Sequence, residues 1–373
     1  MHWRADHDAE TTDWRAVCGR TARTVRRAGR ARTLPDPYHD VYHGSCFDKA
    51  RTIRLDLQYR KGDKMETSEL SANLLCAIEQ EGCKAKIVSV EHLGDLQGDI
   101  NTLHRQAMFD EEFFTEELSG FDFTLTDRLP GAQSLIIAAA PQPQVRVTFT
   151  SEGKDLPCIV PPIYSYATDR KIEELLRSQL EPNGYHFMKA IIPWKLLAVR
   201  SGLAQYGKNN VTYIAGLGSF YRLVAFVSDL PCIEDSWGAL NILKDCTKCD
   251  ACTKACPGGA IGAGRFLLHA ERCLTFHNER QGKFPAWLNP SWHHCLVGCM
   301  ICQKVCPVDK NFRQWVTEGP VFSEAETTAI LQGDSSEHWP RSVMQKIEGL
   351  DLSGYTTVLG RNLEVLAKKR ARG

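Results

Sequence analysis

The hydrophobic pattern between residues 65 and 232 alternates between helical and strand periodicity. One apolar stripe at helical spacing stops at Gly82 and contains Leu70, Leu74, Leu75 and Ile78. The same patterns predict two more helices, at residues 172–180 and 195–199, and four strands, at residues 86–90, 134–139, 145–149 and 222–228. This alternation predicts an α/β domain over residues 65–232.

Two stretches of this domain, residues 134–140 and 223–227, are apolar at almost every position, which suits strands buried on both faces. Three polar residues are assigned from local pattern alone. Tyr164 and Tyr166, two positions apart, are interpreted as strand residues. Asp169 is interpreted as the N-cap of the helix that follows it.

The chain after Trp315 is expected to be helical. Ser323 and Glu326 have the spacing of a capping box. A last amphipathic helix, with a basic end, is indicated by the stripe of Leu359, Leu363 and Leu366.

Residues 1–64 differ from the rest, because arginine recurs between Arg15 and Arg32 without sustained periodicity. Such a segment is typical of a disordered arm, or of sequence upstream of a true start at Met65. A nucleic-acid-binding tail is the alternative. The predicted organisation is an N-terminal extension, an α/β domain, a cysteine-rich domain and a helical segment, at residues 1–64, 65–232, 233–316 and 317–373.

The strongest chemical signal is a pair of cysteine runs between residues 246 and 307. The first reads C-x2-C-x2-C-x3-C-P and the second C-x2-C-x3-C-P, as in ferredoxins with two 4Fe-4S clusters. In such runs the cysteine before proline ligates the other cluster. We therefore expect one cluster on Cys246, Cys249, Cys252 and Cys306, and the other on Cys256, Cys273, Cys299 and Cys302.

Other interpretations of these cysteines explain less. Zinc also favours paired C-x2-C spacing, but two interlocked runs that each end in Cys-Pro fit zinc poorly. Disulfides need an oxidising compartment, and the N-terminus lacks the apolar core of a secretory signal. Spacing alone leaves Cys295 as an alternative ligand to Cys273, because Cys295 completes a C-x3-C-x2-C-x3-C run.

Composition is that of an ordinary globular protein. The apolar content is 43%. The formal net charge is zero, so the overall charge does not favour nucleic-acid binding. No apolar run approaches the about 20 residues of a membrane-spanning helix. Fifteen cysteines without an export signal indicate a reducing cytoplasm, with most thiols on metal.

A loop at residues 201–210 adds a second motif, Ser-Gly-Leu-Ala-Gln-Tyr-Gly-Lys-Asn-Asn. Its glycines and asparagines suit a backbone held close to a ligand. Together with the cysteine runs, it resembles the epoxyqueuosine reductase family, the cobalamin-dependent relatives of reductive dehalogenases. The matching motifs are Leu-Pro-Gly-Ala, Gly-Leu-x3-Gly-Lys, Arg-Cys and Gly-Cys-x2-Cys-Gln-x2-Cys-Pro, at residues 129–132, 202–208, 272–273 and 298–307.

The resemblance implies an α+β protein, with an N-terminal α/β corrinoid-binding-like domain, a two-cluster ferredoxin-like domain and a short helical C-terminal segment. It implies that Cys273 is the ligand and Cys295 is spare. It also implies cobalamin, bound base-off, near the loop residues Gly202, Leu203, Gly207, Lys208 and Asn209.

The chain departs from the family pattern where the family has an acidic proton donor. Residues 187–194, shortly before the Gly-Leu motif, contain no carboxylate. We take Tyr206 and Lys189 as the candidate catalytic residues. The alternatives are Tyr164, Tyr166 and Asp169, and we interpret His293 and His294 as structural residues or donors to cluster sulfur.

These features predict a cytoplasmic iron–sulfur oxidoreductase. Electrons from an external donor such as ferredoxin or flavodoxin would pass through two 4Fe-4S clusters to cobalamin, which reduces a substrate; tRNA is one candidate substrate. The alternative function is a ferredoxin-like electron-transfer protein that reduces or activates a corrinoid partner protein. A third hypothesis, an RNA-binding protein with structural clusters, is supported only by the arginine-rich arm.

Overall fold

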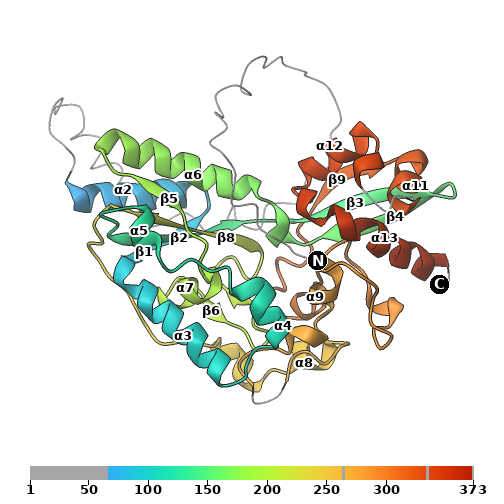
Figure 1. Ribbon diagram of the computed structural model, residues 1–373, viewed down its shortest axis with the longest axis horizontal. Helices are drawn as coiled ribbons and strands as arrows, with labels where there is room; N and C mark the ends of the chain where they lie inside the picture. Colours follow the sequence, from blue (N-terminus) through green and yellow to red (C-terminus); the bar gives the residue numbers. More distant parts are fainter. Residues whose placement is uncertain (1–65, 263–264, 333–335, 372–373) are drawn as a thin grey trace.

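The computed structural model describes residues 66–262, 265–332 and 336–371 (Figure 1). The predictions for residues 1–64 lie outside the described residues. The two larger sheets, each with its own helices, lie side by side, and the cysteine-rich segment packs beneath them. The expected α+β class is confirmed.

The first sheet has the strand order β1-β2-β8-β5, and all neighbouring strands are antiparallel. Its strands are β1 (Lys84–Ser89), β2 (Ser134–Pro141), β8 (Tyr221–Ser228) and β5 (Phe187–Lys189). The long central strands β2 and β8 are the two stretches that are apolar throughout. Their position explains that pattern, since both of their faces are covered.

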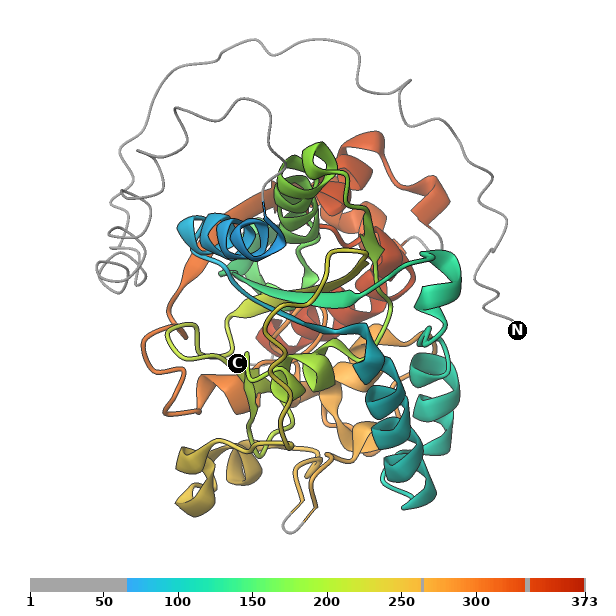
Figure 2. The ribbon, with the colours of Figure 1, turned by 90° about the vertical axis from the view of Figure 1, so that its left-hand side faces the viewer.

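Alternate residues of β2 enter two different cores. Leu135, Ile137 and Ala139 pack on one face, and the other face consists of Ile136, Ala138 and Ala140. The helices α3 (Leu93–Arg105) and α7 (Trp194–Arg200) cover the first face. The second face is covered by α2 (Thr67–Gln80) and α6 (Ala167–Leu180) (Figure 1, Figure 2).

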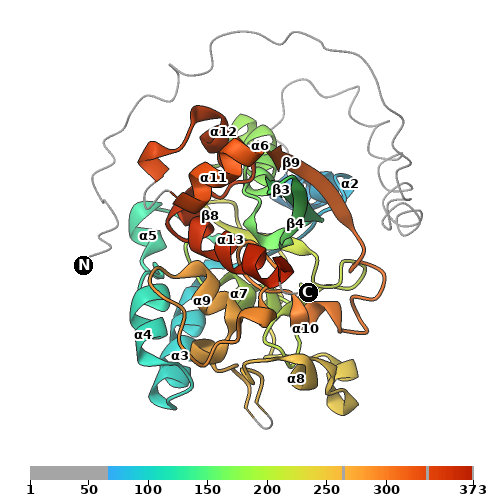
Figure 3. The same ribbon diagram turned by 90° about the vertical axis from the view of Figure 1, so that its right-hand side faces the viewer.

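The second sheet joins distant parts of the chain. β3 (Gln144–Ser151) forms a hairpin with β4 (Lys154–Val160) and pairs in parallel with β9 (Val316–Phe322). Its core includes Phe149 stacked on Phe322 at 4.7 Å between ring centroids. Figure 3 shows the covering helices, which are α11 (Glu324–Gln332), α12 (Arg341–Gly349) and α13 (Thr356–Ala371).

The remaining α-helices and strands are short, and the last three of them lie within the cysteine-rich segment itself. They are α4 (Glu111–Phe113), the π-helix Phe114–Leu118, α5 (Leu125–Arg128), β6 (Gln205–Tyr206), β7 (Thr212–Tyr213), α8 (Ala251–Ala255), α9 (Leu274–Glu279) and α10 (Ile301–Lys304). Within the described residues, no helix has both the length and the apolar character that a membrane span requires.

The local patterns are mostly confirmed. The helix over Leu70–Ile78 is α2, and the capping box is present: Ser323 N–H donates to Glu326 Oε2 at 2.9 Å, and Glu326 N–H donates to Ser323 Oγ at 3.3 Å. The all-helical expectation after Trp315 is wrong, because β9 comes first. Its partner β3 lies about 170 residues earlier, so no local pattern reports the pairing.

Two other interpretations are also wrong. Tyr164 ends a 3-10 turn, Pro162–Tyr164, and Tyr166 is the N-cap of α6, so neither lies in a strand. Asp169 lies inside the first turn of α6, where its buried carboxylate pairs with Arg222 instead of capping the helix.

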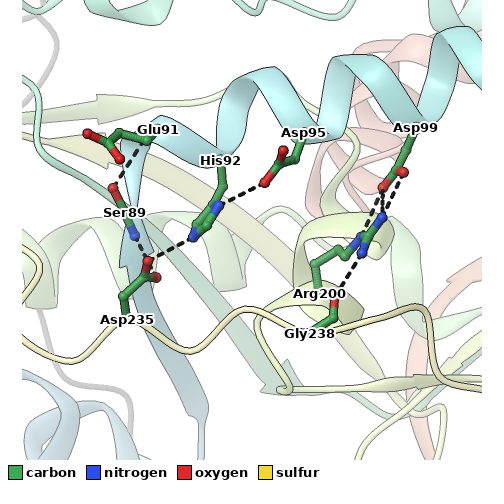
Figure 4. Close-up of polar contacts among 8 residues, drawn as sticks. All are labelled: Ser89, Glu91, His92, Asp95, Asp99, Arg200, Asp235 and Gly238. Atoms are coloured by element: carbon green, nitrogen blue, oxygen red, sulfur yellow. Dashed lines mark hydrogen bonds and ion pairs between the residues drawn. The ribbon is translucent and has the colours of Figure 1, made fainter.

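The connection from the first sheet to the cysteine-rich segment is fixed to α3 (Figure 4). Asp235 Oδ1 accepts from Ser89 N–H at 3.1 Å, and Asp235 Oδ2 lies 2.8 Å from His92 Nε2. The His92 ring also stacks on Trp237, at 4.0 Å between centroids. Further along, Arg200 Nη1 donates to the Gly238 carbonyl at 2.9 Å while its guanidinium pairs with Asp99.

We predict that Asp235→Ala lowers the free energy of unfolding by about 1 kcal/mol, because it removes the carboxylate partner of the Ser89 N–H and of His92 Nε2. Asp95→Ala is the matched control, since this carboxylate contacts the same ring at 3.0 Å but is 56% exposed. Urea midpoints of both variants measure the difference. Equal effects would contradict a specific role for Asp235.

Candidate functional site

The cysteine-rich segment places its thiols in two overlapping groups. Burial raises the pKa of Cys252, and Cys246 and Cys306 raise it further, so these three thiols interact. Burial also raises the pKa of Cys273, and Cys256 adds to that effect. Without metal, neighbouring thiols oppose each other's ionisation.

Cys302 connects the two groups. Burial raises the pKa of Cys302 to about 12, with contributions from Cys273, Cys252 and Cys256. Cys299 interacts with Cys302 and Cys273. Cys302 therefore lies near thiols of both groups, and α10 lies beside α8.

Cys295 occupies a different environment. Its side chain is fully buried in an apolar cluster with Phe220 and Met300. Its backbone lies beside β4, where Leu296 N–H donates to the Ile159 carbonyl at 2.8 Å. Burial raises the pKa of Cys295 to about 12.

No group of three or more His, Cys, Asp or Glu side chains within the described residues is arranged to hold a single metal ion. Several of the cysteine sulfurs accept hydrogen bonds. The Ala260 N–H donates to Cys256 Sγ at 3.3 Å. Backbone N–H groups also donate to Cys252, Cys273, Cys299 and Cys306, which lowers the pKa of each thiol against the larger effect of burial.

The loop of residues 202–209 contacts the cysteine-rich segment. Lys208 Nζ donates to the Cys249 carbonyl at 2.7 Å. Tyr206 N–H donates to the Asn241 carbonyl at 2.8 Å, and the Tyr206 carbonyl accepts from Leu243 N–H at 2.8 Å. Two backbone bonds and one lysine thus hold the start of the first cysteine run against β6.

The other loop residues have different surroundings. Gly202 is exposed and has φ +75°, with Ser236 Oγ 3.8 Å from where a Cβ would lie. Leu203 packs on the first core. At Gly207, a Cβ would lie 2.5 Å from both Asn209 Oδ1 and Tyr213 Cε2, so neighbouring side chains already occupy that space.

The two candidate catalytic residues lie apart from each other. Tyr206 is buried, its ring contacts Phe266 edge to face, and burial raises its pKa. Lys189 Nζ instead lies 2.5 Å from Asp169 Oδ2, with its side chain 38% exposed. Lys189 is therefore held in an ion pair with a buried carboxylate.

Asp169 is the centre of a polar cluster that we call the junction. Its carboxylate accepts from Arg222 at 2.5 and 3.0 Å and from Lys189. The Arg222 guanidinium lies 4.1 Å from the centroid of the Tyr166 ring and 5.8 Å from that of Trp194. Two cations thus share one buried carboxylate between two aromatic rings.

The junction continues into the cysteine-rich segment through Glu279, at the end of α9. The Tyr164 hydroxyl donates to the Glu279 carboxylate, and Tyr164 contacts Tyr355 edge to face at 5.3 Å. Burial raises the pKa of Glu279 to about 7. No local pattern identifies this carboxyl, since its partner Tyr164 is 115 residues away.

Two histidines border the second cysteine run. Burial lowers the pKa of both His293 and His294 to about 4, so both are neutral at pH 7. His294 Nε2 accepts from the Met300 N–H at 3.2 Å. The His293 nitrogens have no hydrogen-bond partner within the described residues.

Comparisons with known proteins agree with this geometry. The model of a 4Fe-4S double cluster binding domain matches residues 245–309, which contain all eight predicted ligands. The epoxyqueuosine reductase of Escherichia coli (strain K12) is 30% identical over 167 residues, covering 41% of this chain and 42% of that protein. The corresponding enzyme of Lactococcus garvieae (strain Lg2) is 31% identical over 184 residues, covering 47% and 51%. The matched part thus spans about half the length of these relatives, or less.

Solved structures resemble a larger part of the fold. An epoxyqueuosine reductase from Bacillus subtilis aligns with a TM-score of 0.59 at 19% identity, covering 82% of each chain. One from Streptococcus thermophilus aligns with a TM-score of 0.59 at 16% identity, covering 80% of this chain and 81% of that one. The predicted resemblance is therefore confirmed: this chain has the fold of the epoxyqueuosine reductases and carries a double 4Fe-4S cluster binding domain.

Proposed function

We propose that this protein is an iron–sulfur reductase in which two 4Fe-4S clusters pass electrons to an acceptor held beside the first sheet. The observation that carries the proposal is the pair of overlapping thiol groups inside the matched cluster-binding domain. A 4Fe-4S cluster exchanges one electron at a time, so two neighbouring clusters suit a relay.

The residues present fit two such clusters. We assign one to Cys246, Cys249, Cys252 and Cys306, and the other to Cys256, Cys273, Cys299 and Cys302. The backbone N–H groups directed at these sulfurs support the assignment, because thiolate ligands of clusters accept such hydrogen bonds. The apolar surroundings of Cys295 favour Cys273 as the fourth ligand of its cluster.

A buried polar atom near Cys273 supports a bound group there. Asn210 Nδ2 is buried with no partner within the described residues. Lys195 Nζ donates to the Asn210 carbonyl at 3.3 Å. Burial lowers the pKa of Lys195, and the nearby Cys273 raises it. A cluster sulfide, or an acceptor group beside it, would supply the missing partner of Asn210.

The resemblance implies cobalamin as the electron acceptor, but the loop residues expected to contact it fit poorly. Gly202 alone among the five is exposed. The space beside Gly207 is filled, Lys208 holds the Cys249 carbonyl, and Asn209 is buried. We therefore derive no catalytic step through cobalamin from this loop.

The proton that a reduction consumes needs a donor near neutral pH. Tyr206 is buried with a raised pKa, and Lys189 is paired with Asp169. We propose Glu279 for this role, because it faces Tyr164 and Tyr355 at the junction and its pKa is about 7. It would take the place of the carboxylate that residues 187–194 lack.

The runner-up function is a ferredoxin-like carrier that reduces a partner protein. Anaerobic purification followed by iron, sulfide and corrinoid analysis separates the two functions. About eight irons with bound corrinoid support the reductase, whereas about eight irons without corrinoid favour the carrier. Zinc without acid-labile sulfide would contradict both.

A related epoxyqueuosine reductase was solved with an epoxyqueuosine-modified tRNA stem loop, so that stem loop is the first substrate to test.

We predict that Cys273→Ala reduces the bound iron by about half, because it removes one ligand of one cluster. Cys295→Ala is the matched control and should keep the full iron content, although it opens a small cavity in the apolar cluster with Phe220 and Met300. Iron and sulfide per chain measure both. The opposite pattern would make Cys295 the ligand.

We also predict a pH-dependent effect of Glu279→Gln. The raised pKa means that the folded state binds this proton more tightly than the unfolded state. The stabilisation is complete below about pH 4.5 and is lost as the pH rises through about 7. The variant should therefore gain stability relative to the wild type between pH 5.5 and pH 8, by on the order of 2–3 kcal/mol.

Urea midpoints at several pH values measure this change. Glu271→Gln removes a 40% exposed carboxylate from the same segment and controls for the change in net charge. Glu117 and Tyr355 also surround Glu279, and Arg222 interacts with Tyr355. A stability difference for Glu279→Gln that does not vary with pH would show that the carboxyl does not titrate in this range.

A further inference from the structure

The junction carries one more positive charge than its buried carboxylate balances. Arg222 alone completes an ion pair with Asp169, because its Nε and Nη2 donate to the two carboxylate oxygens at 2.5 and 3.0 Å. This two-point arrangement is the one that a guanidinium and a carboxylate favour. Both side chains are almost fully buried. Lys189 is therefore a second cation at a carboxylate that already has a partner.

The ammonium group of Lys189 has hydrogens to spare. Its Nζ donates to Asp169 Oδ2 at 2.5 Å, and Asp169 is its one hydrogen-bond acceptor within the described residues. An ammonium group has three hydrogens, so two remain for another acceptor. Lys189 ends β5, an edge strand of the first sheet, and its side chain is 38% exposed. A ligand in solvent can therefore reach this group.

Two aromatic rings flank the ammonium group. Lys189 Nζ lies 5.9 Å from the centroid of the Tyr166 ring and 5.6 Å from that of Trp194. Trp194 Nε1 donates to the Ala190 carbonyl at 2.7 Å, and Tyr166 N–H donates to Asp351 Oδ2 at 2.7 Å. Hydrogen bonds thus fix both residues, and the cation is held between two rings that attract it.

The surface around this cation is apolar. Ile163, Tyr166 and Ile191 are among the few large apolar side chains that are exposed within the described residues, at 54%, 38% and 57%. The Ile163 carbonyl accepts from Arg222 Nη1, and Ile191 follows Lys189 by two residues. Apolar side chains around a small number of polar groups are typical of a ligand-binding surface.

The acidic residues that border this surface have partners of their own. Asp122 N–H donates to the Ile191 carbonyl at 2.8 Å, but the Asp122 carboxylate pairs with Arg128 at 3.2 Å. The Asp351 carboxylate accepts from backbone N–H groups at the start of α6 and lies 3.7 Å from Arg170. Neither carboxylate has a hydrogen bond or ion pair with Lys189, so the excess charge stays available to an anion.

We propose that Lys189, between Tyr166 and Trp194, binds the anionic group of the substrate, and that the substrate is a small organic monoanion with a flat apolar body. This inference rests on the proposed function in taking the junction, where Glu279 lies, as the substrate site. One excess positive charge matches one carboxylate, and the apolar surface matches the body. A polynucleotide would instead need several cations on this face to match its phosphates.

The test measures binding to protein that holds both clusters, by isothermal titration calorimetry. The probe is 2-naphthoate, which has one carboxylate on a flat apolar body. Naphthalene-2-carboxamide has the same body without the charge, and inorganic phosphate has charge without the body. Each should bind at least about tenfold more weakly than 2-naphthoate, since each lacks one of the two interactions. Equal affinity for the carboxamide would overturn the anion site.

Lys189→Gln should weaken the binding of 2-naphthoate by at least about tenfold and leave that of the carboxamide unchanged. Lys171→Gln is the matched control, because this lysine of the same domain is 47% exposed and pairs with Glu81 at 2.8 Å. Its affinity for 2-naphthoate should equal that of the wild type. Equal losses in both variants, or no loss in Lys189→Gln, would contradict the proposal.

The epoxyqueuosine-modified tRNA stem loop provides a further comparison. It should not compete with 2-naphthoate. Competition that is present in the wild type and lost in Lys189→Gln would assign the site to a polynucleotide and overturn the proposed substrate class.

Iron and sulfide content are measured in every sample. Wild-type protein without two clusters would overturn the proposed function together with this inference, whereas full clusters without binding of 2-naphthoate would overturn this inference alone. If Lys189→Gln does not fold, reductive methylation of the wild type with peptide mass mapping decides. 2-Naphthoate should protect Lys189 and leave Lys171 reactive, and equal methylation of Lys189 with and without the probe would contradict the site.

Discussion

The convergence of eight thiols, seven from two distant runs and one from Cys273 between them, is the constraint on which the rest of the structure depends. The x2 spacings bring together three thiols of the first run and two of the second, and in our assignment the cysteine before each proline reaches the group of the other run. The second run therefore has to be held against the first, across the segment between Cys256 and Cys299. Burial raises the pKa of Cys302, and thiols of both groups add to that rise, which supports the assignment.

Parts of the chain outside the cysteine-rich segment hold this arrangement in place. The loop between β6 and β7 binds the first run through Lys208. Asp235 fixes the connection to α3, and Arg222 and Glu279 lie at the junction where the two sheets and the segment meet. The first sheet thus serves as the support of the cluster domain, and the junction is the place where titratable groups gather.

The sequence predicted what local pattern determines. The central strands were evident because both faces are covered, and the cysteine spacing identified a double cluster domain that the family model confirms. It could not predict β9, whose partner strand is far away in the chain, or the role of Asp169, whose partner Arg222 is 53 residues distant. Gly207 was noticed as a loop glycine, but its packing against Tyr213 requires the folded hairpin.

The central claim, two clusters locked together by exchanged ligands, is tested most directly by the EPR spectrum of the fully reduced protein. Clusters that exchange ligands through Cys256 and Cys306 lie close enough for their unpaired spins to interact. The account predicts a spectrum broadened by this interaction, which resolves into a simple signal when only one cluster is reduced. Two independent, unbroadened signals at full reduction, or protein that holds zinc without sulfide, would contradict it.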